Sequence, residues 1–309
     1  MKYKQFFPGV LLVVISTSSS YAQNTDCDES CLLEIAGQYL NDVADQDASK
    51  LPWGDRVRYT ENNVAMMIGD GFWGAGPGVN HEQGFMVADA STSNVVWLGI
   101  TTEHGQAAYH GLRLGIENRQ IVDVESYLGR EGTPDLFNAT DGYRPHASFS
   151  DTLDRNEGTS RERMIALVDG WFNSKQLNDG KVFTTLSGDC VRITNGVNTT
   201  HGDHWTAEVA QGCEAQLLEG IYKSVDRIRA RRYPVVNEET GVVVALSIED
   251  HATRYVEYMS TSGKTLKVEV EYPNARGMLE IFRIRNGEIE RMEGVSVFLP
   301  YYIHSLWQD

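Results

Sequence analysis

Histidines that stand beside acidic residues at the ends of predicted strands are the best candidates for acid–base chemistry in this sequence. His104 follows Glu103, and His251 follows Asp250. Histidine titrates near neutral pH and can therefore accept or donate a proton. Successive side chains of a strand point to opposite faces, so only one of Asp250 and His251 can enter the same pocket. We predict His251, Asp250 and His104 as catalytic candidates; the alternative is that they are solvated residues at strand ends.

A glycine-rich segment supplies a fourth catalytic candidate. Residues 69–74, Gly-Asp-Gly-Phe-Trp-Gly, match the pattern GxGxxG. A phosphate-binding loop needs small residues followed directly by a helix, whereas Phe72 and Trp73 are bulky and Pro77 follows shortly. We therefore exclude a dinucleotide site and interpret the segment as a loop over a pocket. In this interpretation Asp70 is the acid and Trp73 binds the substrate; a plain hydrophobic anchor is the alternative.

Further aromatic and basic residues are candidates for substrate binding. Trp97 and Tyr258 would stack on a ring-shaped ligand, although core packing is an equally good use of buried aromatics. His110 lies near His104 on the same predicted strand pair. Arg58 would bind a substrate carboxylate through two parallel hydrogen bonds, with an internal salt bridge as the alternative.

We expect neither a metal nor a cofactor. The segment His201-Gly202-Asp203-His204 offers three ligand types in four residues, but no distant fourth ligand is evident. A turn with exposed imidazoles is the alternative that we prefer. The sequence contains no GxSxG, HExxH or P-loop pattern, so nucleophilic hydrolase, zinc protease and nucleotide-driven chemistry lack their usual residues.

The first 22 residues have the features of a cleaved signal peptide. Lys2 and Lys4 precede an apolar stretch, which is followed by Ser20-Tyr21-Ala22 with small residues at the positions that signal peptidase prefers. The apolar stretch is too short for a membrane anchor. We therefore expect a secreted or periplasmic protein.

Four cysteines would then be in an oxidising compartment, where disulfides are the default. Three pairings are open to four cysteines. We favour Cys190 with Cys213 and Cys27 with Cys31. Cys213 also begins an insertion to Arg231 whose apolar spacing predicts an additional helix.

The chain contains an internal repeat. Two segments carry apolar residues at i, i+3, i+4, i+7 and i+8, which predicts one buried stripe on each of two helices. The final hairpins of both halves match at an offset of 168 residues. We align Arg58 with Arg192 and Val95 with Val242, and predict domains at 23–128 and 161–309 joined by a linker at 129–160. The two stripes, at an offset of 132 residues, are Leu32, Ile35, Ala36, Tyr39 and Leu40, and Met164, Leu167, Val168, Trp171 and Phe172.

Five segments carry a resemblance to known proteins: Gly69–Trp73, Leu112–Leu114, Arg192–Val197, Arg232–Gly241 and Phe282–Pro300. They resemble a group of secreted, mostly fungal proteins built from two nuclear transport factor 2-like (SnoaL-like) halves. The resemblance covers nearly all of the chain after the signal peptide. It implies an α+β fold: a tandem repeat of two cone-shaped domains, each a curved antiparallel sheet around helices that enclose an apolar pocket. The wider superfamily includes isomerases, dehydratases, cyclases and binding proteins, so the fold alone does not select a reaction.

From these observations we predict a cofactor-independent lyase, dehydratase or isomerase that acts on a small cyclic or aromatic compound. The alternatives are a non-catalytic ligand-binding or interaction protein, and sugar cleavage by paired carboxylates, for which no spacing argues. A net charge of −16 over 309 residues argues against nucleic acid as a partner. We expect no membrane anchor, and a homodimer is one arrangement that the sequence leaves open.

Overall fold

The computed structural model describes residues 27–133, 135–202, 210–268 and 270–308. The predicted signal peptide lies outside these residues, as do Asp203 and His204 of the histidine-rich segment. Within the described part of the chain, none of the helices combines the length and hydrophobicity needed to cross a bilayer.

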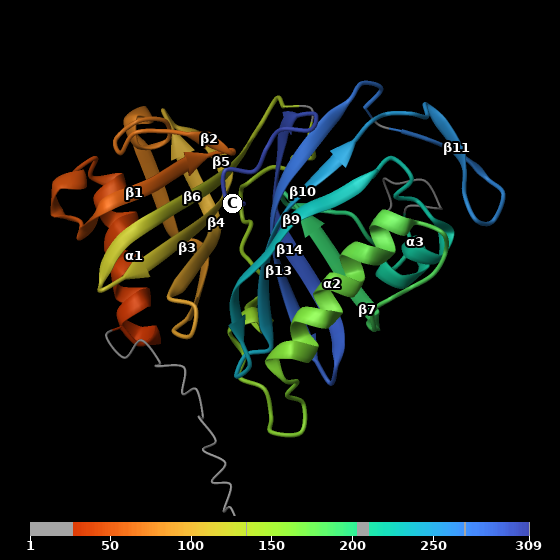
Figure 1. The fold of residues 1–309 in the computed structure, drawn as a ribbon, viewed down its shortest axis with the longest axis horizontal. Coiled ribbons are helices and arrows are strands. Elements are labelled where there is room, and N and C mark those ends of the chain that lie inside the picture. Colours follow the sequence, from red (N-terminus) through yellow and green to blue (C-terminus); the bar gives the residue numbers. More distant parts are fainter. Residues whose placement is uncertain (1–26, 134, 203–209, 269, 309) are drawn as a thin grey trace, which may run out of the picture.

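The first half consists of one helix against a six-stranded sheet (Figure 1). The predicted apolar stripe is buried on this helix, and the carboxylate of Asp28 caps its N-terminus by accepting a hydrogen bond from the backbone of Cys31. The sheet order is β2-β1-β6-β5-β4-β3, and β1 runs parallel to β6. The elements are α1 (Glu29–Ala44), β1 (Trp53–Glu61), β2 (Val64–Ala65), β3 (Pro77–Asp89), β4 (Asn94–Glu103), β5 (Gln106–Glu117) and β6 (Gln120–Arg130).

The second half repeats this topology. Its sheet order is β8-β7-β14-β13-β10-β9, again with one parallel pair, β7 and β14. The duplication predicted from the two apolar stripes is therefore present as two sheets with the same strand order. The elements are α2 (Arg161–Leu177), β7 (Leu186–Thr194), β8 (Val197–Asn198), α3 (Cys213–Glu219), β9 (Arg227–Asn237), β10 (Val242–His251), β11 (Glu257–Met259), β12 (Thr265–Lys267), β13 (Asn274–Arg285) and β14 (Glu288–Pro300).

The two sheets pack against each other through the faces that point away from their helices (Figure 1). Their contacts join counterpart elements, β3 with β9 and β6 with β14. Side chains of residues 131–160, which connect the halves, complete this shared core, and Phe149 from a short 3-10 helix is fully buried there. Trp307 near the C-terminus lies between the halves, with Arg58 and Arg113 from the first sheet and Arg232 from the second over its ring.

Strand register corrects our alignment of the halves by one residue. Asn94 pairs with Gly115, and Val242 pairs with Arg283, which is the counterpart of Gly115 in the second hairpin. Asn94, not Val95, is therefore the counterpart of Val242, and Trp97 is the counterpart of Ala245.

The same correction applies to the first strand of each half. Thr60 pairs with Ala65 before one turn, and Ile193 pairs with Asn198 before the other. The counterpart of Arg192 is therefore Tyr59, and Arg58 is not its counterpart as we predicted. Neighbouring residues of a strand face opposite sides, so this shift decides which side chain points to the helix.

The second half also carries two insertions. The predicted helix from Cys213 to Arg231 is only partly correct, because α3 ends at Glu219, where Gly220 adopts a left-handed conformation (φ +73°) that stops the helix. Residues from Arg227 onward are already in β9. Between β10 and β13 the chain forms the β11–β12 hairpin, whereas the first half has only a tight turn at Gly105.

Candidate active site

A cavity of about 640 Å³ lies in the second half, between α2, α3, the sheet and the β11–β12 segment. One part of its lining is apolar and one part is polar. The apolar residues include Ile221, Tyr258, Leu266, Val268, Val270 and Met278. The polar residues include Lys175, Arg192, Thr194, Gln216, Glu249 and His251.

A buried ion pair joins the helix to the sheet in the polar part. Lys175 Nζ on α2 lies 2.5 Å from Glu249 Oε1 on β10, and the two side chains are 1% and 5% exposed. The ammonium group is also 5.2 Å from the centre of the Tyr222 ring, which favours a cation. Burial lowers the pKa of Lys175, and Glu249 opposes this shift. Burial raises the pKa of Glu249, but the charges of Lys175 and Arg192 outweigh this effect and lower it to about 2.

A second buried pair lies beside the first. Arg192 on β7 donates from Nε and Nη2 to Glu280 Oε1 on β13, at 3.1 and 2.8 Å. Burial would lower the pKa of Arg192, but Glu280 raises it, so the guanidinium keeps its charge. Glu280 Oε2 has no hydrogen-bond partner among the described residues. The polar part of the cavity is therefore lined by two cations, Lys175 and Arg192, each held by a carboxylate.

His251 is a neutral base on the same face of the sheet. It is 9% exposed, and its Nε2 has no hydrogen-bond partner within the described residues. Burial, and then the positive charge of Arg276, lower the pKa of His251 to about 4. Glu249 is two residues earlier on the same strand, so their Cα atoms are about 7 Å apart. At neutral pH the ring is uncharged and can accept a proton at Nε2 from a ligand in the cavity.

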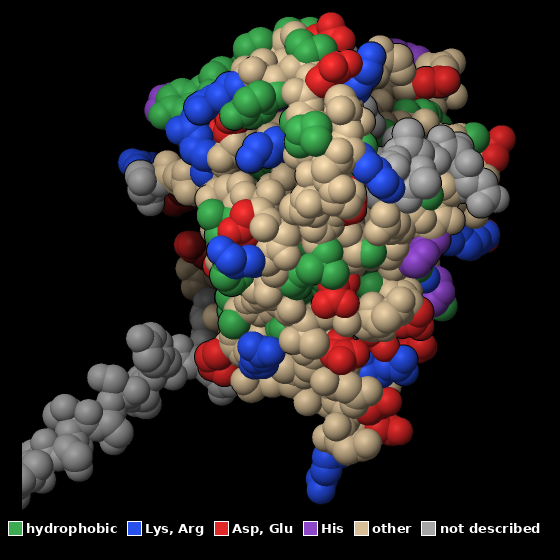
Figure 2. Space-filling view, turned by 90° about the vertical axis from the view of Figure 1, so that its right-hand side faces the viewer, with side chains coloured by type: hydrophobic (Ala, Val, Ile, Leu, Met, Phe, Trp, Pro, Cys, Tyr) green, Lys and Arg blue, Asp and Glu red, His purple; other side chains and the backbone are tan. Residues whose placement is uncertain are grey.

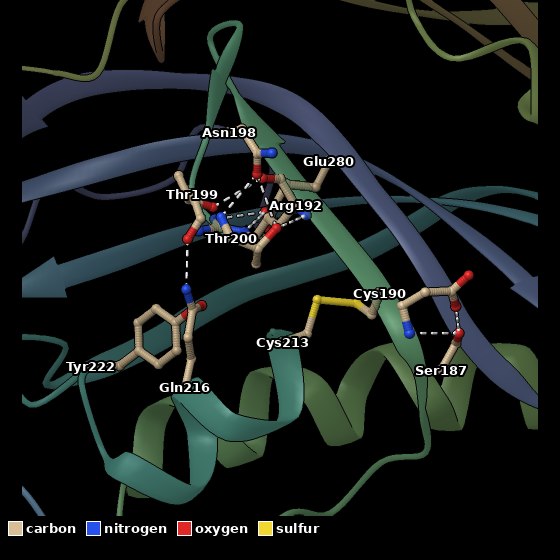
Figure 3. The surroundings of a disulfide bond; sticks show 11 residues. Ser187, Cys190, Arg192, Asn198, Thr199, Thr200, Cys213, Gln216, Tyr222 and Glu280 are labelled. Atoms are coloured by element: carbon tan, nitrogen blue, oxygen red, sulfur yellow. Dashed lines mark hydrogen bonds and ion pairs between the residues drawn. A yellow bond between two sulfur atoms is a disulfide. The ribbon is translucent and has the colours of Figure 1, made fainter. Parts of the chain in front are cut away.

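The Cys190–Cys213 disulfide anchors the wall of the cavity (Figure 3). It ties β7 to the first residue of α3. From α3, Gln216 Nε2 donates to the Thr199 carbonyl at 2.6 Å, and the Tyr222 hydroxyl donates to Gln216 Oε1 at 2.7 Å. The structure contains both expected disulfides, since Cys27 and Cys31 are also bonded.

The segment between β10 and β13 forms the apolar wall opposite the sheet. Tyr258 on β11 donates its hydroxyl hydrogen to the carbonyl of Ile221 at 2.5 Å, which ties the hairpin to the loop after α3. Leu266 and Val268 line the cavity from the same segment. This connection has no counterpart in the first half, so the apolar wall is a feature of the second half alone.

Two of the predicted site residues, His251 and Tyr258, line this cavity. Asp250 faces the opposite side of β10, as the alternation of side chains requires. Its carboxylate accepts hydrogen bonds from Arg229 Nε and Nη2 at 2.7 and 3.0 Å and is fully buried. Asp250 and His251 therefore do not meet in one pocket, and the contacts of Asp250 are those of a structural ion pair.

The interior of the first half is filled by aromatic side chains. Trp73 and Trp97 are each 3% exposed and belong to the core cluster around α1. Gly84 and Gly99 make room for the Trp97 ring, because a Cβ atom on either would collide with it. The corresponding position in the second half is Ala245, a much smaller side chain that is buried in the core around α2. The two tryptophans that we expected to hold a substrate ring are thus packed into a core.

His110 lies in the same core. Its ring is 4.9 Å from that of Phe72 and 5.6 Å from that of Trp97, and Nε2 hydrogen-bonds to Ser126 Oγ at 3.2 Å. Burial, and then the charge of Arg130, lower the pKa of His110 to about 3. These contacts separate His110 from the cavity of the second half.

The remaining predicted residues lie at the surface of the first half. Asp70 borders a shallow depression next to Met67, and His104 occupies the turn between β4 and β5 with a positive φ of 48°. Arg58 donates to the carbonyl of Leu306 at 3.3 Å. The structure does not bring Asp70, His104 or Arg58 together with His251, because they belong to the other half.

Sequence reasoning missed Lys175, Glu249 and Glu280. A signal for Lys175 was present in the sequence. If the alignment of the two helices is extended by one helical turn at the same offset, Lys175 aligns with Val43, so a charged residue takes the place of an apolar one. Glu280 replaces Leu112 at the offset of the hairpins. A charged residue at a buried position that is apolar in the other half indicates a candidate functional site, because functional sites are where a sequence departs from the needs of packing.

Residues 157–296, just under half of the chain, match the family described as "Domain of unknown function (DUF8021)". No curated protein matches the chain.

Several solved structures resemble one half of the chain. A proposed polyketide cyclase from Xanthomonas campestris is 18% identical, with 44% of this chain and 92% of that chain covered and a TM-score of 0.30. A proposed isomerase from Bacillus subtilis is 12% identical, with 44% and 87% covered and a TM-score of 0.30. An NTF2-like protein from Cytophaga hutchinsonii is 13% identical, with 45% and 99% covered and a TM-score of 0.27. These values are too low to bear on the activity of this chain.

Proposed function

We propose that the second half is a cofactor-independent acid–base enzyme, an isomerase or lyase, for a small ring compound that carries a carbonyl group. The observation that carries this proposal is the placement of the neutral His251, with an unpartnered Nε2, in the same cavity as the buried Lys175–Glu249 pair. A base and a fixed cation are the two groups that removal of a proton next to a carbonyl requires.

His251 is the proton acceptor in this proposal. Its Nε2 takes the proton from the carbon next to the carbonyl and returns it to another atom of the product, or to the leaving group. Because the pKa of His251 is about 4 when no ligand is bound, the ring is available as a base at all pH values above this. The negative charge that develops on the substrate oxygen would in turn make the imidazolium more favourable.

Lys175 stabilises the developing oxyanion. Its charge is already desolvated and held by Glu249, so it needs little reorganisation during the reaction. Arg192 is fixed in the same way by Glu280. The apolar wall made by Leu266 and Val268 would cover the ring of the substrate and exclude water, which strengthens these electrostatic interactions.

The predicted compartment and partner remain part of the proposal. Two disulfides support a protein that works in an oxidising compartment, and a cleaved signal peptide at residues 1–22 would take it there. Lys and Arg are interspersed with Asp and Glu on the face of the second half in Figure 2, a pattern that suits a small ligand better than a nucleic acid backbone.

The test is deuterium exchange at the carbon next to a carbonyl. The protein is incubated in D₂O with 2-tetralone and cyclohexanone, and deuterium incorporation is followed by proton NMR. We expect exchange above the buffer rate for at least one ketone, and a loss of about 100-fold or more in His251→Asn, the usual range for removal of a general base. The exchange rate should also fall as the pH drops through about 4, where His251 becomes protonated.

His81→Asn is the matched control, because His81 is an exposed histidine on β3 of the first half. It should exchange at the wild-type rate. Equal exchange in wild type and His251→Asn would remove His251 as the base. Saturable binding of the ketones without any exchange would instead support the alternative, a ligand-binding protein.

A further inference from the structure

We propose that Lys175 forms a covalent iminium with the carbonyl carbon of its substrate, so that this half takes aldehydes or ketones as covalent substrates. This inference rests on the proposed function, which it deepens by giving Lys175 a bond to the substrate in place of a charge contact alone. Lys175 is the one lysine among the described residues that is buried and lines the cavity together with a base.

The surroundings of Lys175 favour a cation at Nζ without a requirement for three hydrogens. Glu249 Oε1 is 2.5 Å away, and the rings of Tyr222 and Trp171 have their centres at 5.2 and 6.0 Å. A carboxylate and two aromatic rings stabilise a positive charge whether the nitrogen belongs to an ammonium or to an iminium group. Glu249 is therefore suited to be the counterion of both.

The step balances without a co-reactant. The ammonium group gives one proton to a neighbouring base, and the free amine attacks the carbonyl carbon to form a carbinolamine. The carbinolamine oxygen is protonated and leaves as water while the nitrogen lone pair forms the C=N bond. The net reaction converts one ammonium and one carbonyl into one iminium and one water, so the charge beside Glu249 is unchanged.

His251 completes the chemistry. The iminium withdraws electrons from the neighbouring carbon more strongly than a carbonyl does, which eases removal of its proton. His251 Nε2 is an unpartnered, neutral acceptor in the same cavity. Proton removal gives a neutral enamine, and reprotonation at another atom followed by hydrolysis releases the product and restores Lys175.

The position of Lys175 is specific to this half. Its counterpart on α1 is Val43, and the counterpart of Glu249 on β4 is Thr101, both buried. The fold thus stabilises this helix and sheet without an ion pair here. A buried lysine and glutamate at these positions are therefore not a requirement of this topology, and a chemical role would account for them.

The experiment is reductive trapping. The full-length protein is incubated with 2-tetralone or cyclohexanone and sodium cyanoborohydride, and the adducts are mapped by peptide mass spectrometry. We expect a fast mass gain on Lys175 equal to the mass of the ketone less one oxygen atom. Exposed lysines outside the cavity, such as Lys50 and Lys181, whose side chains are 55% and 72% exposed, provide the uncatalysed rate in the same sample.

Lys175→Arg separates the covalent role from a charge contact. Arginine keeps the positive charge but forms no iminium with a ketone under these conditions. We expect this variant to lose deuterium exchange by at least tenfold, with Lys181→Arg as the control at the wild-type rate. Trapping on the wild-type protein decides the question even if Lys175→Arg does not fold.

The outcomes distinguish this inference from the proposed function. Exchange in the wild type without an adduct on Lys175 would overturn the covalent role and leave acid–base catalysis standing. An adduct on Lys175 that forms no faster than those on Lys50 and Lys181 would overturn it as well. Fast labelling of Lys175 that is unchanged in His251→Asn supports the covalent role even if His251 is not the base.

Discussion

Replacement of Glu249 by glutamine tests the energetics of the buried pair directly. At 2.5 Å and an effective dielectric constant of about 20, the attraction between the two unit charges is about 7 kcal/mol. Desolvation of both ions offsets most of this in the wild type. Glu249→Gln removes the attraction but leaves the cost of burying Lys175, so the free energy of unfolding should fall by about 3–5 kcal/mol at pH 7.

The loss should depend on pH in a defined direction. Burial lowers the pKa of Lys175 in the folded state, and removal of Glu249 takes away a group that opposes this shift. The unfolded state, with an ordinary pKa of about 10.4, then binds more protons, so the free energy of unfolding rises with pH by up to about 1.4 kcal/mol per unit. The rise should be seen between the lowered pKa and about 10.4.

Urea unfolding of the wild type and three variants, followed by tryptophan fluorescence between pH 6 and 9, measures these effects. The double variant Lys175→Met/Glu249→Leu replaces both ions by apolar groups of similar volume and should be more stable than Glu249→Gln, since the first half has no ions at the corresponding positions. Lys175→Met alone leaves the carboxylate unpaired and should also be destabilised. A loss below about 1 kcal/mol for Glu249→Gln at pH 7 would refute this reasoning.

Two further substitutions exchange a residue of the first half for a smaller or uncharged one. His110→Met introduces the type of residue found at the counterpart, Met278, and should reduce the loss of stability in acid. The pKa of His110 is about 3 in the fold against about 6.5 when unfolded, so the wild type loses roughly 3 kcal/mol from this group between pH 7 and pH 4, and the variant should not; urea unfolding at both pH values measures it. Trp97→Ala should cost about 3–5 kcal/mol and open a cavity in the first half, detected by binding of a hydrophobic dye; no dye binding would show that the core collapses instead.

Much of the fold follows from periodicity. The apolar residues of α1 and α2 keep a regular helical spacing, because a helix against a sheet must bury one face. The repeat of this spacing predicts the duplication. The one-residue errors at Arg58 and Val95 arise in strands, where similar residues stand one place out of register: an arginine lies next to the true counterpart of Arg192, and a run of valines begins one residue late. The register irregularities occur at corresponding places in both halves and do not cause these errors. A shift of one residue exchanges the faces of a strand.

The candidate site could be predicted only in part. His251 was found because an ionisable residue at a strand end is visible in sequence, and alternation correctly separated it from Asp250. Lys175 and Glu280 lie within apolar segments. Whether the interior of a half is open or filled depends on side chains that meet only in three dimensions, such as Trp97 against Gly84 and Gly99. Comparison of the two halves position by position is the signal that would have found them.

The packing of counterpart strands from the two halves against each other has a consequence for how the sequence of such a protein can change. A surface that meets its own copy is the rule in a symmetric homodimer, where every substitution occurs twice. Here one polypeptide supplies both sides, so each interior has been free to accept mutations that the other did not share. One could become solid and serve as a scaffold, while the other kept space and charge for chemistry.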